Sequence, residues 1–169
     1  ANNEIGRWLR SKHNLPHLHT LNPGGGVKLP FGRVELAIAH HSSALPDGSY
    51  GGEPNGILIL TNEGTTIYHA RDTSVFLDMQ LIGEHGIDLA MLPIGDYYTM
   101  GIDGSLKAIE FLKPKAVIPM HYKTLVLKRE LAPVDRFLKE MGVNEAVPQP
   151  KLVVNKASLP LTLQVVLLG

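Results

Sequence analysis

The spacing of apolar residues predicts one helix followed by strands in the first half of the chain. Ile5, Trp8 and Leu9 recur at helical spacing, which predicts an amphipathic helix over residues 3–12. Glycine and proline then interrupt the pattern at "NPGGG" and again in the loop "SSALPDGSYGGEPNG". Strands are predicted in residues 26–41, around a Pro-Phe-Gly turn, and in 57–70, as a hairpin that turns at residues 62–64.

The second half of the chain alternates between helical and strand-like patterns. Helical spacing covers residues 74–86, 103–113 and 130–141, and apolar strand patterns cover 87–95, 115–122 and 161–169. Strands first, then alternating helices and strands, are typical of a layered α/β domain. No internal repeat or linker is visible, so we expect residues 1–169 to form a single domain.

Composition narrows the class of protein without identifying it. The 169 residues are 44% hydrophobic and 19% charged, the balance of a folded protein. Lys+Arg and Asp+Glu number 16 each, so no net charge favours nucleic acid or an acidic membrane as a partner. Cysteine is absent, which excludes disulfides and thiolate metal ligands and fits a cytoplasmic location.

Polar, ionisable residues stand where three of the predicted strands end. His40 and His41 follow the second strand, His69 and Asp72 end the hairpin, and His121 follows a strand in the second half. Strand ends are where α/β folds gather ligands, because the loops there are held by a rigid sheet. Imidazole nitrogens and carboxylate oxygens are ligands of zinc, manganese and iron. A single histidine of this kind is more often an ordinary hydrogen-bonded residue, whereas three strand ends favour one shared site.

Several separated motifs resemble the metallo-β-lactamase superfamily. "HHSS", "YGGEPNGILI", "TIYHARDT", "LIGEHGIDLAMLPIGDYYTMG" and "PMHY" occur in its order and spacing, up to about residue 155. More narrowly, the chain resembles metal-dependent hydrolases related to ascorbate-6-phosphate lactonase. The resemblance implies a layered αββα sandwich and a divalent metal cofactor, zinc before manganese or iron.

The resemblance also implies roles for individual residues. His41 would bind a first metal, Asp72 would bridge two metals, and His121 would bind the second. His69 and Asp96 match positions near the site, where they would support the ligands. Asp72 as a ligand and His69 as its support are the residues to which we assign catalytic roles.

Two departures from the family pattern bear on these expectations. Arg71 stands where the family has glycine. If the position needs a positive φ, arginine strains the backbone there and could disturb Asp72. The alternative is that the Arg71 side chain simply points to solvent. The family signature His-x-His-x-Asp-His does not occur in the chain. We interpret His13, His17 and His19 as surface or packing residues. The resemblance thus implies the C-terminal two-thirds of a domain, truncated before its N-terminal strands.

The sequence favours a metal-dependent hydrolase that cleaves an ester, lactone, phosphoester or amide of a small molecule with a metal-activated water. The alternative is a catalytically impaired fragment that acts as a binding or assembly module. Truncation would leave apolar strand positions within 57–60 and 89–92 less covered. We therefore expect a homo-oligomer, or pairing with the missing N-terminal segment.

Overall fold

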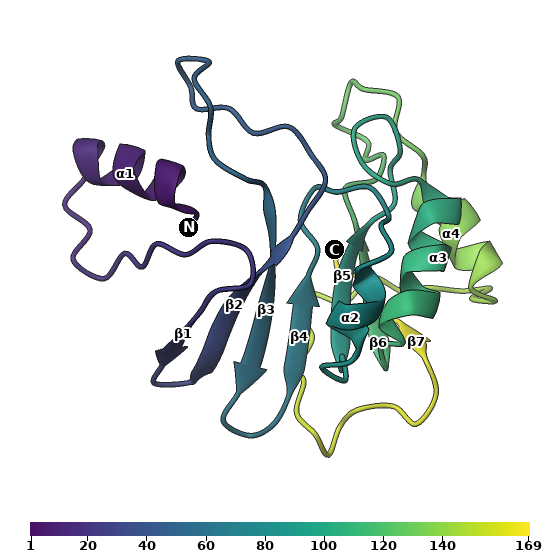
Figure 1. The fold of residues 1–169 in the computed structure, drawn as a ribbon. Helices are drawn as coiled ribbons and strands as arrows, with labels where there is room; N and C mark the ends of the chain where they lie inside the picture. Colours follow the sequence, from purple (N-terminus) through teal and green to yellow (C-terminus); the bar gives the residue numbers. More distant parts are fainter.

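A single mixed β-sheet organises the molecule (Figure 1). The computed structural model describes residues 1–169. Its strands are β1 (Gly26–Leu29), β2 (Gly32–Ile38), β3 (Asn55–Thr61), β4 (Thr66–His69), β5 (Leu89–Pro93), β6 (Ala116–Met120) and β7 (Gln164–Val165). Its helices are α1 (Asn3–Lys12), α2 (Met79–Gly83), α3 (Ile102–Leu112) and α4 (Val134–Glu140). The predicted layered α/β fold is confirmed.

The connections between strands set the sheet order, which follows the chain from β1 to β7. β1 to β4 pair antiparallel: short turns join β1 to β2 and β3 to β4, and the loop of residues 39–54 joins β2 to β3. β4 to β7 pair parallel because α2, α3 and α4 lie in the crossovers between them. As a result, β2, β4, β5 and β6 all end at the same edge of the sheet, where β3 begins. The polar strand ends singled out in the sequence therefore meet at one edge.

The main core lies between the sheet and three helices on one of its faces. Figure 1 shows α2, α3 and α4 gathered on the same side, while α1 stands apart beyond β1 and β2. Tyr68, Leu92, Val117 and Phe137 are completely buried in this core. Each apolar side chain removed from water contributes about 1.5–3 kcal/mol, so this face supplies most of the stability of the sheet.

An apolar row crosses the opposite face of the sheet. Residues directly opposite one another on successive strands form it: Val27, Val34, Ile59, Ile67, Leu89 and Ala116. The first four are half-buried and the last two fully buried. Burial increases at β5 because Leu152 and Val154 pack over this end of the row. Both lie in the segment that follows α4, called here the C-terminal segment.

The expectation of bare positions within 57–60 and 89–92 is therefore wrong for β5. Leu89, Ala90 and Leu92 are fully buried, because α2 and α3 cover one side of β5 and the C-terminal segment covers the other. In β3, Leu58 is buried under the helices, whereas Ile57 and Ile59 are only half-buried. The less covered surface is confined to the outer face of the first four strands.

Several elements are shorter than their sequence patterns indicate, among them α4, which begins at Val134 instead of residue 130. α2 begins only at Met79 instead of residue 74, since the Ser74 amide donates to the His40 carbonyl oxygen and holds the preceding residues in a loop. β7 comprises only Gln164 and Val165 of the predicted strand 161–169. None of the helices is long and apolar enough to cross a membrane.

Candidate metal centre

A polar cavity of about 460 Å³ opens at the edge where the strands end. Only two of its twelve lining residues are hydrophobic. The side chains come from α1, the loops after β2, β4 and β6, and the start of β3: Asn2, Ile5, His41, Ser42, Ser43, Pro54, Asn55, His69, Arg71, Asp72, Met120 and His121. The topology thus brings three predicted metal ligands to one cavity.

Three successive parallel strands are each followed by non-glycine residues with left-handed backbone. Arg71 follows β4 with φ 59°, Asp96 and Tyr97 follow β5 with φ 61° and 67°, and His121 follows β6 with φ 54°. Such conformations cost of order 1 kcal/mol or more per residue and persist only where their surroundings enforce them. Their concentration at this edge is typical of a functional site.

Thr73 joins three loops of this edge. Its buried hydroxyl oxygen accepts from the His40 amide at 2.9 Å and donates to the Ser74 carbonyl oxygen at 2.9 Å. Its own carbonyl oxygen accepts from the Met100 amide at 2.8 Å. The loops that carry His41, Asp72 and Asp96 are therefore fixed relative to one another by one side chain and its backbone.

Arg71 shapes the electrostatics next to Asp72. Its backbone amide donates to His69 Nδ1 at 3.0 Å, and its guanidinium donates to Asn55 Oδ1 at 3.1 Å. Partial burial, followed by the positive charge of Arg71, lowers the pKa of His69, although Asp72 opposes this shift. The lowered pKa agrees with the hydrogen bond, because Nδ1 accepts only in the neutral imidazole.

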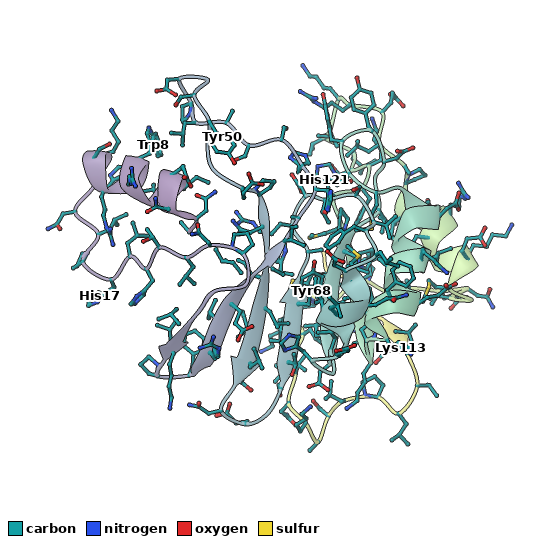
Figure 2. The ribbon with its side chains drawn as sticks, in the orientation of Figure 1. Trp8, His17, Tyr50, Tyr68, Lys113 and His121 are labelled. Carbon is teal, nitrogen blue, oxygen red and sulfur yellow. The ribbon has the colours of Figure 1, made fainter.

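The structure places the predicted site residues in two groups. His41, His69, Asp72 and His121 line the polar cavity, with His121 at the upper end of the sheet in Figure 2. Asp96 lies on the neighbouring loop but does not line the cavity. The other histidine cluster, His13, His17 and His19, is also outside the lining. Figure 2 shows His17 at the left, below α1 and well away from His121.

The histidine and aspartate side chains of the cavity are suitable ligands for a divalent metal, but their spacing in this structure is too wide for a shared ion. His121 Nδ1 is buried without a hydrogen-bond partner, as an unused ligand atom would be. However, nowhere do three or more His, Cys, Asp or Glu side chains lie close enough together to hold an ion. The metal-binding roles implied for His41, Asp72 and His121 require their ligating atoms to lie close together. This close approach is not seen, and their ligand roles stay a prediction.

Asn55 and Asn2 are cavity residues that the sequence analysis did not single out. Asn55 opens β3, is 5% exposed and binds the Arg71 guanidinium. A polar residue next to an apolar strand was the available signal for it. Asn2 caps α1 by accepting from the Ile5 amide, and its own amide donates to the carbonyl oxygens of Gly51 and Glu53. An asparagine just before the helical pattern is a signal for the cap, but nothing in the sequence indicates the contacts with Gly51 and Glu53.

Comparison with known proteins places the fold. Residues 9–121 match the family model described as "Beta-lactamase superfamily domain". This chain belongs to the metallo-β-lactamase superfamily. A solved metallo hydrolase from the archaeon Ignicoccus hospitalis superposes with a TM-score of 0.73 and 32% identity, over 99% of this chain and 64% of that one.

Among sequences of this superfamily, the chain is similar to proteins named UPF0173 metal-dependent hydrolase. The protein of that name from Thermus thermophilus is 52% identical over 104 residues, which cover 62% of this chain and 46% of the relative. The one from Salinibacter ruber is 36% identical over 149 residues, which cover 87% of this chain and 66% of the relative. The chain spans about half the length of the first relatives it matches.

Proposed function

We propose that this chain contributes to the metal centre of a hydrolase that acts on an ester, lactone, phosphoester or amide. The observation that carries the proposal is the convergence of His41, Asp72 and His121 on one polar cavity of a metallo-β-lactamase fold. Relatives named metal-dependent hydrolases support the reaction class.

The predicted ligands and His69 have different roles in this proposal. His41, Asp72 and His121 would hold the ion, with zinc favoured by two imidazoles and a carboxylate and with manganese or iron as alternatives. A bound divalent metal supplies a water of lowered pKa and polarises the bond to be cleaved. His69 fixes the loop between β4 and Asp72 by accepting the Arg71 amide. Water adds across the bond, so an ester yields an acid and an alcohol.

Metal binding tests this proposal. We expect isothermal titration with Zn²⁺ to show binding that a chelator reverses and that Asp72→Asn or His121→Gln weakens at least tenfold, since each substitution removes a ligand. His17→Gln, a histidine substitution away from the cavity, is the matched control and should bind like the parent. Hydrolysis of 4-nitrophenyl acetate, with and without metal, reports whether the bound ion is productive.

A second candidate is an assembly module without catalysis. It is favoured by the absence of three clustered ligands and by the half-buried apolar row on the outer face. This candidate fits our proposal that the chain is the C-terminal part of a longer domain. In that domain, the other metal ligands would belong to the N-terminal part. Zinc affinity that Asp72→Asn and His121→Gln both leave unchanged would favour this candidate over the hydrolase.

A further inference from the structure

A second cavity adjoins the polar one. It has a volume of about 700 Å³ and shares Met120 and His121 with the first cavity. Six of its ten lining residues are hydrophobic, against two of twelve in the polar cavity. Met120 and His121 thus stand between two different linings. Ionisable groups line the polar cavity, whereas leucine, proline and tyrosine line much of the second cavity.

The loop after β6 builds this cavity, and hydrogen bonds pin both of its ends. The Lys123 amide donates to the Ala132 carbonyl oxygen at 3.0 Å, and Lys123 Nζ donates to the Arg129 carbonyl oxygen at 2.7 Å. The Ala132 amide in turn donates to the Gly95 carbonyl oxygen at 2.8 Å, which joins the loop to the end of β5. The wall formed by Leu127 and Leu131 is therefore preorganised.

Arg129 is the cation at this cavity. Its guanidinium carbon lies 4.9 Å from the centre of the Tyr98 ring, and one of its nitrogens donates to the Tyr98 hydroxyl. No carboxylate pairs with Arg129, since Glu130 pairs with Lys123 instead. No Asp or Glu lines the cavity either. Guanidinium N–H groups are consequently left for an anion from outside the protein.

The loops that line the cavity also carry exposed apolar side chains. Leu125 and Val126, at the tip of the pinned loop, are 107% and 91% exposed. Tyr97, beside Tyr98 on the loop after β5, is 70% exposed. Exposed apolar groups on the loops that form a concave apolar wall favour a ligand-binding role for these loops.

We infer that the second cavity binds the aryl or branched acyl part of an anionic substrate, whose carboxylate or phosphate pairs with Arg129. The inference rests on the proposed function, because the shared wall at His121 would then place the bond to be cleaved over the polar cavity. It names the substrate class: small molecules that combine one apolar group with one negative charge.

Binding of simple probes tests this site without any turnover. We expect 3-phenylpropionate to shift the methyl NMR signals of Leu127, Leu131 and Leu168, which line the cavity. Phenyl phosphate should do the same if phosphate is the preferred anion. The neutral 3-phenylpropan-1-ol and the aryl-free propionate should each bind about tenfold more weakly, since each lacks one of the two recognised groups.

Variants separate the charge from the apolar wall. Arg129→Met should weaken 3-phenylpropionate about tenfold and leave the alcohol unchanged. Lys128→Met removes the same charge at a neighbouring position outside the lining and should change neither affinity. Leu127→Trp should fill the cavity and abolish binding of both. Equal affinity of parent and Arg129→Met for the acid, or shifts outside the cavity, would overturn the inference.

The two proposals can fail separately. Binding of 3-phenylpropionate should persist in the presence of a chelator and in Asp72→Asn, because no predicted metal ligand other than His121 lines this cavity. Zinc binding without binding of the aryl acid would refute the second cavity alone. Binding of the aryl acid without zinc binding would refute the metal centre alone.

Discussion

At the scale of single residues, Thr73 holds the loops of the site together, a role that its place in the sequence does not indicate. It is fully buried, and its hydroxyl joins the His40 amide to the Ser74 carbonyl oxygen. Both partners would lose their bond if the hydroxyl were removed. Leaving a buried donor or acceptor unsatisfied costs about 1–3 kcal/mol.

Thr73→Val should therefore lower the free energy of unfolding by about 1–3 kcal/mol and weaken zinc binding, because the loop carrying His41 loses its anchor. Thr73→Ser keeps the hydroxyl and should restore most of both. Amide hydrogen exchange at His40 reports the anchor directly: fast exchange in Thr73→Val and slow exchange in the parent and Thr73→Ser. Slow exchange in all three would show that the hydroxyl bond is dispensable.

Arg71 affects the same loop through its backbone and its charge. Its φ of 59° shows that the position does require left-handed backbone. Arg71→Gly should raise zinc affinity roughly tenfold, because it relieves this conformation and removes a positive charge next to the predicted ligands. Arg71→Ala removes the charge alone and should give part of the gain. Calorimetric titration that finds equal affinity in all three proteins would mean that the arginine is harmless.

At the scale of elements, a buried carboxylate fastens the C-terminal segment to the sheet. Asp88, just before β5, is 1% exposed and accepts from Lys156 Nζ and from the Thr66 amide at 2.9 Å, while Lys115 Nζ lies 3.1 Å away. Burial alone would raise the pKa of Asp88. The hydrogen bonds from Lys156, Thr66 and Lys115 outweigh it, so the pKa is lowered.

Because folding lowers the pKa of Asp88 below its unfolded value near 4, the ionised carboxylate stabilises the folded state at pH values above that unfolded pKa. This stabilisation is lost as the pH falls through the lower, folded pKa. Lys156→Met should reduce stability at pH 6 and flatten its decline between pH 5 and pH 3. Urea unfolding at several pH values measures both effects. Lys151→Met lies in the same segment without an ion pair and should follow the parent curve.

The sequence predicted best those elements that depend on local pattern. α1 occupies the expected residues 3–12, and the hairpin turns where expected, because capping, spacing and turn residues are local properties. The left-handed backbones of Asp96 and His121 depend on packing between strand ends and left no local signal. The same is true of the Thr73–His40 bond, which joins separate loops. The second cavity escaped because its loop has no apolar periodicity.

At the scale of the whole molecule, the outer face of the sheet is unevenly covered. The row from Val27 to Ile67 is half-buried, whereas its continuation through Leu89 and Ala116 is closed by the C-terminal segment. Apolar area left in water costs about 25 cal/mol per Å² relative to burial, so a few hundred Å² amounts to several kcal/mol. We propose that a second copy of the chain, or a further segment of a longer chain, covers this part.

Light scattering at micromolar concentration should therefore show a mass above that of one chain. Ile59→Thr keeps a β-branched residue in β3 but reduces the apolar area, so it should shift the distribution toward monomer. Leu125→Thr, the removal of an apolar side chain at a fully exposed position away from the sheet, is the control. A monomer at all concentrations would mean that the half-buried row is adequately covered as it stands.

The pairing of β6 with β7 has a consequence for how the protein is made. Ala116 pairs with Gln164, near the other end of the chain from α1, and Leu152 and Val154 cover the outer face of the same strands. A ribosome completes β6 and His121 well before it makes any of these residues. During that interval the nascent chain presents an open strand edge and an uncovered apolar face, the two features that most favour wrong association. Leu152, Val154 and Gln164, which have no part in the proposed chemistry, therefore decide when the open edge of β6 becomes covered and protected from aggregation.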